Sequence, residues 1–196
     1  MTIQTVSPAA DLAMLLTAAV LVALAVVVVV QLVRRRLRPA VLAAGAAGVL
    51  VAVYGLALVG AGLAGASREL RPGDTKCFDD WCASMVAARQ DEVAGTVGVT
   101  VMVQNRGRGR VMRSNLARAY LEVPGVGEVA PQGLGGQLQA PLQPGERVEV
   151  DLTFVLPTDA RATRFVVVEG GKELGPATFE IGGEGSPFHG VAGWPL

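Results

Sequence analysis

The sequence is poor in the side chains that enzymes most often use for catalysis and metal binding. It contains one histidine, His189, and two cysteines, Cys77 and Cys82, in 196 residues. A zinc site needs three or four ligands, and a serine triad would depend on His189 and the nearby Ser186. The sequence therefore predicts no catalytic residue, no metal, no cofactor and no small-molecule substrate, and it indicates that the protein is not an enzyme.

Charge is scarce in the first third of the chain. Residues 12–33 and 40–65 form two apolar runs without a charged side chain. Each run is long enough, at about 1.5 Å per residue, to cross a hydrocarbon core of about 30 Å. The sequence predicts a short tail over residues 1–11 and two transmembrane helices joined by a loop at 34–39. Because neither run carries an ionisable residue, an ion or proton pathway is not expected.

The loop between the two runs is basic and sets the expected topology. It contains four arginines within RRRLRP, namely Arg34, Arg35, Arg36 and Arg38. By the positive-inside rule this loop stays in the cytoplasm, which places both termini and everything from residue 66 outside it. The expected location is the cell membrane. Two alternatives are a cleaved N-terminal signal peptide and cleavage after Ala66, which would release the soluble domain.

The second apolar run is rich in small residues at four-residue spacing. Gly48 and Ala52 form one such set, and Ala57, Ala61 and Gly65 form another. Small residues allow close approach of helix backbones. We expect them to pack against the first helix; the alternative is contact with another membrane subunit.

Residues 66–196 show the alternation of half-buried β-strands. In TVGVTVMVQN, residues 96–105, every second residue is valine, and these valines are predicted to face inward; RVEVDLTFVLP at 147–157 repeats the pattern. Further candidate strands are WCASMVAAR, ARAYLEV, TRFVVVEG and PATFEIG. Residues 124–145 are rich in glycine and proline and predict a surface excursion with at most one short strand. The expected fold is an all-β immunoglobulin-like sandwich after a transmembrane helical hairpin.

Three stretches carry a resemblance to a known family. CFDDWC, VTVMVQNRGRG and LQPGERVEVDLTFVLPTDA resemble the telokin-like immunoglobulin-type extracellular domains of bacterial membrane-anchored or secreted proteins, over roughly residues 73–182. The resemblance implies a fold and no reaction. The sequence departs from sandwiches with an inter-sheet disulfide, because cysteines five positions apart cannot bridge two sheets.

The two cysteines flank a segment that must fold back on itself if they are bonded. In an oxidising compartment a disulfide between Cys77 and Cys82 is expected, with Asp79 and Asp80 forming a turn. Phe78 or Trp81, the other two residues of the segment, would then fill the end of the core. The alternatives are a redox pair and a metal clip.

Four arginines in NRGRGRVMR form the candidate binding residues: Arg106, Arg108, Arg110 and Arg113. They could contact lipid phosphates or an anionic polymer; the alternative is a charged hairpin end that protects a sheet edge. A calcium site at Asp74, Asp79 and Asp80 is less favoured than solvated turn carboxylates. From residue 66 onward there are sixteen acidic residues against thirteen lysines and arginines, and the expected compartment is extracytoplasmic, so nucleic acid is not an expected partner.

These observations lead to one expected function and two alternatives. We expect a membrane-anchored, extracytoplasmic, non-enzymatic module that binds or braces a partner in the envelope or membrane, with the arginine stretch and residues 124–145 as first contacts. The alternatives are a thiol-based sensor that uses Cys77 and Cys82, and an accessory subunit of a membrane complex.

Near the C-terminus, Phe188 and Trp194 are expected to hold the tail against the sandwich.

Overall fold

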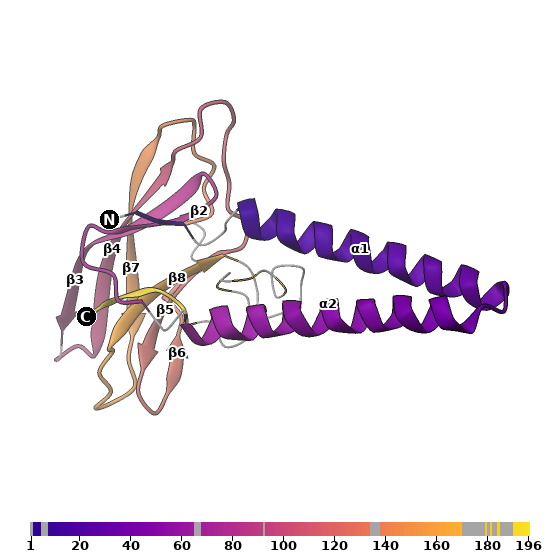
Figure 1. Ribbon diagram of the computed structural model, residues 1–196. Coiled ribbons are helices and arrows are strands. Elements are labelled where there is room, and N and C mark those ends of the chain that lie inside the picture. The colour runs from indigo at the N-terminus through magenta and orange to yellow at the C-terminus, as the bar shows by residue number, and fades with distance from the viewer. Residues whose placement is uncertain are drawn as a thin grey trace. The chain divides into compact units, whose positions relative to one another are not determined.

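The computed structural model describes residues 2–4, 8–64, 68–91, 93–133, 138–169, 179, 181, 184 and 190–196. The chain divides into a helical unit, which includes the segment 174–190, and a sandwich unit, which includes the N-terminal residues. Figure 1 shows both units. The expected strand PATFEIG lies almost wholly outside the described residues, as do Ser186, Phe188 and His189.

The helical unit contains two long apolar helices, α1 (Pro8–Val33) and α2 (Leu37–Ala64), which confirms the expected pair. Both are long and apolar enough to span a membrane. Each begins earlier than the apolar run suggests. Pro8 opens α1 and Asp11 lies in its first turn, where a proline and an acidic residue are both favourable. The connection is therefore shorter than residues 34–39, because residues 37–39 belong to α2.

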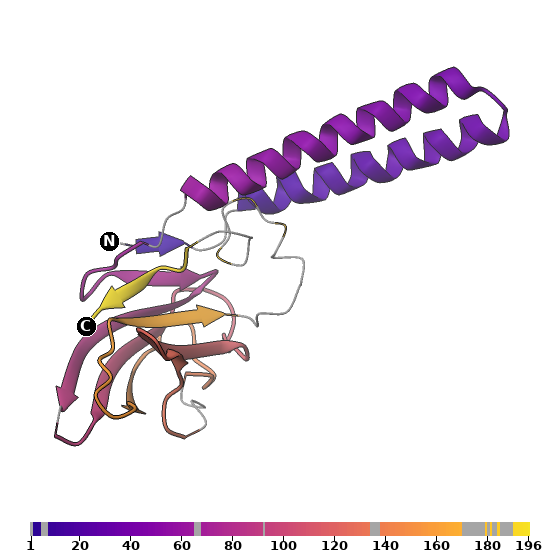
Figure 2. The same ribbon diagram turned by 90° about the horizontal axis from the view of Figure 1, so that it is seen from below.

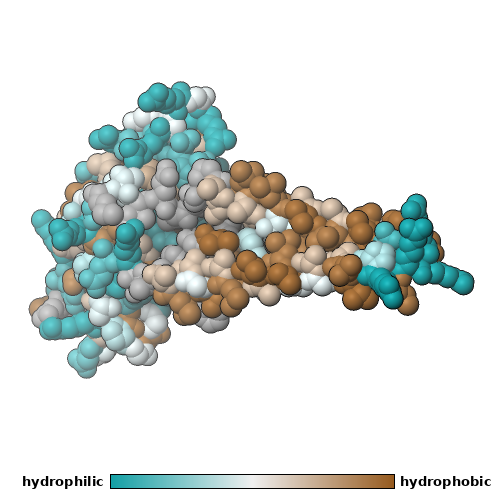
Figure 3. All heavy atoms as spheres, in the orientation of Figure 1, coloured by the Kyte–Doolittle hydropathy of each residue, from teal (hydrophilic) through white to brown (hydrophobic). Residues whose placement is uncertain are grey.

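A tight turn joins the helices. Arg36 N–H donates to Gln31 O at 2.8 Å, and Arg35 N–H donates to Leu32 O at 2.9 Å. This is the pairing of a Schellman motif, and Arg35 occupies its left-handed position with φ 55°. All of the arginines in this turn are exposed. In Figure 3 the turn between α1 and α2 is hydrophilic, whereas most of the visible helix surface is hydrophobic.

The helices pack along one face each. Positions of reduced exposure recur at intervals of three and four residues in both helices, the spacing of a left-handed helix pair. Leu58 and Gly62 are buried on α2, whereas Gly48, Ala52 and Ala57 are exposed. A Cβ added to Gly48 would meet nothing within 4 Å. The expectation that these three small residues pack against α1 is therefore wrong; Ala61 is half-buried, and Gly65 lies outside the described residues.

The first sheet of the sandwich has the order β1-β2-β3-β4-β7. Its antiparallel strands are β2 (Thr75–Phe78), β3 (Trp81–Asp91), β4 (Thr96–Asn105) and β7 (Arg147–Val155). The short strand β1 (Thr2–Gln4) pairs in parallel with β2, in the register Thr2 to Thr75. The N-terminal tail thus contributes an edge strand, which sequence patterning did not indicate.

The second sheet is antiparallel with the order β6-β5-β8-β9. Its strands are β5 (Ala117–Val123), β6 (Gly127–Val129), β8 (Arg164–Glu169) and β9 (Gly193–Pro195). Figure 2 shows the sandwich unit from a second direction. Within the described part of residues 124–145, β6 is the one short strand, which agrees with the expected surface excursion.

The two sheets share one hydrophobic core, as in a β-sandwich. Val97, Val99, Val101 and Val103 of β4 are all buried, which confirms the predicted inward face. From the other sheet, Phe165 and Trp194 are wholly buried and their ring centroids lie 5.7 Å apart. Trp194 therefore belongs to the core of the second sheet through β9.

Candidate functional site

The CFDDWC segment forms a β-hairpin between β2 and β3. Cys77 and Cys82 face each other across the two strands, with their Cα atoms 4.0 Å apart, and are joined by a disulfide. Asp79 and Asp80 form the two-residue turn, in which Asp79 has φ 55°. This confirms both the predicted bond and the predicted turn. A disulfide is typical of an oxidising compartment.

The disulfide lies on the opposite face of the hairpin from the core. Because side chains alternate along a strand, Phe78 and Trp81 point inward, and their ring centroids lie 5.8 Å apart within the core. Cys77 and Cys82 point away from the core, yet they are only 2% and 1% exposed. A thiolate that attacks this disulfide therefore needs local opening first, which favours a structural bond over a redox pair.

A lysine lies inside the core next to the disulfide hairpin. Lys76 of β2 is 0% exposed, and its Nζ donates to Val167 O at 2.7 Å and to Ala192 O at 3.0 Å. The Nζ also lies 5.2 Å from the centroid of the Phe78 ring. Because Val167 belongs to β8 and Ala192 precedes β9, the ammonium joins the first sheet to the second. The sequence contained a signal for this, since alternation places Lys76 on the same face as Phe78.

The candidate binding arginines lie on the connection from β4 to β5, which crosses between the two sheets. We call residues 105–113 the arginine loop. The alternative interpretation of these arginines, a hairpin end at one sheet edge, is therefore wrong. Arg106, Arg108, Arg110 and Arg113 are all exposed. Arg113 Nε donates to Gln139 O at 3.0 Å, so this side chain is tied to the neighbouring loop.

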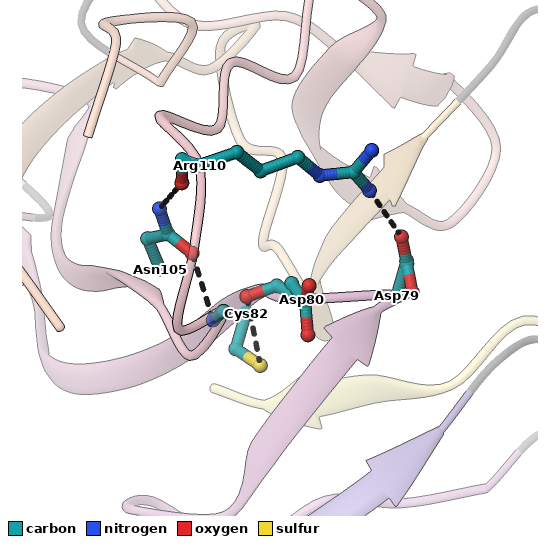
Figure 4. Close-up of polar contacts among 6 residues, drawn as sticks. Asp79, Asp80, Cys82, Asn105 and Arg110 are labelled. Carbon is teal, nitrogen blue, oxygen red and sulfur yellow. Dashed lines mark hydrogen bonds and ion pairs between the residues drawn. The ribbon is translucent and has the colours of Figure 1, made fainter. Parts of the chain in front are cut away.

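The structure brings the arginine loop against the acidic turn of the disulfide hairpin (Figure 4). Arg110 forms an ion pair with Asp79, with Nη2 and Oδ2 3.2 Å apart. Arg106 N–H donates to Asp80 O at 2.8 Å, and Arg106 Nη1 lies 3.9 Å from Cys77 Sγ. Since both members of the ion pair are largely exposed, it contributes no more than about 1 kcal/mol. Its main effect is to neutralise one guanidinium of the loop.

One buried side chain organises the arginine loop. Asn105 is 0% exposed, and its amide nitrogen donates to Arg110 O at 2.9 Å and to Leu142 O at 3.0 Å. Its side-chain oxygen accepts the N–H of Gly107 at 2.9 Å (Figure 4). A Cβ at Gly107 would lie 2.8 Å from Asp80 Oδ2 and 3.0 Å from Asn105 Oδ1, so a larger residue here would displace the Asp80 carboxylate. The loop is therefore fixed at both ends and at its contact with the acidic turn.

Two of the three aspartates considered for calcium serve other contacts through their carboxylates. Asp79 pairs with Arg110, and Asp74 Oδ2 accepts the N–H of Arg71 at 2.9 Å. Among the residues that the structure describes, no group of three or more His, Cys, Asp or Glu side chains could hold a metal ion.

A surface concavity of about 540 Å³ lies at the other end of β3. It is lined by the β3–β4 turn and by the segment that follows β7. Asp91 Oδ1 accepts the N–H groups of Val93 and Ala94, so this carboxylate stabilises the turn. Nothing in the sequence pattern indicated the concavity.

Comparison of the chain with protein-family models, with curated proteins and with solved structures finds no match. Two long apolar helices and a β-sandwich are what the structure establishes.

Proposed function

We propose that this chain is a membrane-anchored, extracytoplasmic module that binds or braces a partner in the cell envelope and is not an enzyme. The helices α1 and α2, of 26 and 28 residues, supply the anchor. The exposed arginines between them would stay on the cytoplasmic side. The disulfide of the β2–β3 hairpin supports an extracytoplasmic sandwich. In this topology both chain ends lie outside the cytoplasm.

The sandwich is, in this proposal, immunoglobulin-like. The chain crosses between the sheets after β4, after β6 and after β7, and β4 pairs with β7 while β5 pairs with β8. This is the Greek-key path of immunoglobulin-like sandwiches. The resemblance to telokin-like domains supports the same fold and adds no activity.

The arginine loop is the proposed contact with the partner. One observation carries this assignment: buried Asn105 and closely packed Gly107 hold in place a loop that exposes four guanidinium groups. A loop that is already ordered loses less conformational entropy when it binds. Because Arg110 is partly neutralised by Asp79, Arg106 and Arg108 provide the attraction for an anionic partner.

Topology is tested with single cysteines in the variant Cys77→Ser/Cys82→Ser. Val93 is fully exposed in the β3–β4 turn, and Arg35 is exposed between the helices. We expect a membrane-impermeant maleimide to label Val93→Cys in intact cells and Arg35→Cys only after lysis. The reverse pattern would overturn the extracytoplasmic assignment.

Partner binding is tested by photo-crosslinking in intact cells. A photoreactive amino acid at position 108 should give a defined adduct with an envelope component, and the same residue at Val93 should not. The adduct should weaken in the variant Arg106→Ala/Arg110→Ala, which lacks the neighbouring guanidinium groups. If positions 108 and 93 give the same adducts, the arginine loop is not the contact.

A second candidate function, an accessory subunit of a membrane complex, is supported by the exposed face of α2. Gly48 and Ala52 lie four residues apart outside the contact with α1, where they could receive a helix of another membrane chain. Native electrophoresis should show a larger species that is lost in the variant Gly48→Leu.

The thiol-sensor alternative predicts that redox buffers open the disulfide in the folded protein, and burial of both sulfurs opposes it.

A further inference from the structure

A residue of the β8–β9 connection contacts the helical hairpin. Tyr54 of α2 donates its hydroxyl to the backbone carbonyl of Phe179 at 2.6 Å, across 125 residues of sequence. Both residues belong to the helical unit. Phe179 is 56% exposed, so this hydrogen bond holds its backbone while more than half of the residue's surface remains uncovered by protein.

Tyr54 lies within the proposed membrane span. At about 1.5 Å per residue, it is about 24 Å along the axis of α2 from Arg38, whereas a hydrocarbon core is about 30 Å thick. With Arg38 at the cytoplasmic boundary, Tyr54 is therefore a few ångströms inside the outer boundary. The first helix gives a similar membrane thickness. Its uncharged residues 12–33, which follow the charged residue Asp11, extend about 33 Å.

A backbone carbonyl at this depth must be hydrogen-bonded, because lipid offers no donor. The Tyr54 hydroxyl supplies that donor. An exposed phenyl ring beside it is costly in water and favourable among acyl chains. Tyrosine is also enriched at membrane boundaries, where its ring is in lipid and its hydroxyl finds a polar partner.

We propose that Phe179 inserts into the outer leaflet beside α2, with its carbonyl held by Tyr54 and its ring in contact with lipid acyl chains. The inference rests on the proposed membrane anchoring. It adds a third point, after the two helices, at which the helical unit contacts the bilayer. It names the lipid acyl region as the partner of this side chain.

The test uses the full chain, with Phe179→Trp, reconstituted in phosphatidylcholine vesicles. Trp81 and Trp194 are wholly buried in the sandwich. Their background fluorescence is recorded separately with the unsubstituted protein. Vesicles with lipids brominated in the upper acyl chain should quench most of the fluorescence that Trp at 179 adds. Adding Tyr54→Phe should weaken this quenching, because the carbonyl loses its donor.

The possible outcomes separate the inference from the proposal on which it rests. If the protein does not float with the vesicles, the membrane anchor fails and the inference fails with it. If the protein floats but brominated lipid leaves the added fluorescence unchanged, Phe179 is not in the bilayer and the inference alone is overturned. Unchanged quenching after Tyr54→Phe would refute the positioning role of the hydroxyl.

Discussion

The buried ammonium of Lys76 gives the sharpest test of how the two sheets are held together. The substitution Lys76→Met keeps an unbranched side chain of similar length but removes the charge. It takes the donor away from the carbonyls of Val167 and Ala192, which lie 2.7 and 3.0 Å from Nζ. Both carbonyls lie at a buried part of the second sheet.

The expected magnitude follows from these contacts. A hydrogen bond from a charged donor contributes about 1.5–3 kcal/mol, so loss of two would cost about 3–6 kcal/mol. Removal of the ammonium also ends its desolvation penalty, which offsets part of that loss. We therefore expect Lys76→Met to lower the free energy of unfolding by about 2–4 kcal/mol.

The measurement is denaturant unfolding of the detergent-solubilised full chain, followed by tryptophan fluorescence. The chain has two tryptophans, and both are buried in the sandwich, so the signal reports this unit and not the helices. Arg147→Met on the edge strand β7 is the matched control: Arg147 is exposed, and its loss should change stability by less than about 0.5 kcal/mol. Equal or greater stability of Lys76→Met would refute the view that the ammonium stabilises the sandwich.

Two further predictions concern the hairpin and the arginine loop. Cys77→Ser/Cys82→Ser should lower the free energy of unfolding by about 2 kcal/mol, because the disulfide closes a short loop; an unchanged unfolding midpoint would contradict a structural bond. Asn105→Ala should cost about 2–3 kcal/mol, because the carbonyls of Arg110 and Leu142 lose their donor, and should also weaken photo-crosslinking from position 108. Arg108→Ala is its control and should leave stability unchanged, since the side chain is exposed. If Asn105→Ala leaves both stability and crosslinking intact, the arginine loop is not organised by this side chain.

The elements that could be predicted from the sequence are those long enough to show a period. The two helices and strands β3, β4, β5, β7 and β8 have at least six residues each. Strands β1, β6 and β9 have three residues and β2 has four, which is too short for alternation to be distinguished from chance. The parallel pairing of β1 with β2 also joins segments separated by both helices, and local pattern contains no information about such a contact.

The candidate site also contains some features that local sequence predicts and others that depend on contacts between distant segments. The disulfide and its Asp79–Asp80 turn follow from cysteine spacing and turn chemistry, so they were predictable. The ion pair of Asp79 with Arg110 and the role of Asn105 depend on how the β4–β5 connection crosses between the sheets. Sequence alone suggested a hairpin at that point, because a glycine-rich turn after a strand usually reverses the chain within one sheet.

The position of β1 bears on whether the sandwich can act away from the membrane. Thr2–Gln4 pairs with β2, and the chain between these two strands forms both apolar helices. Cleavage after Ala66 would therefore leave β1 on the membrane fragment and expose the backbone edge of β2. Since an exposed strand edge invites pairing with other chains, the released domain would be less protected than the intact one. Under the proposed membrane anchoring, the strand order thus favours a sandwich that works while attached to the two helices.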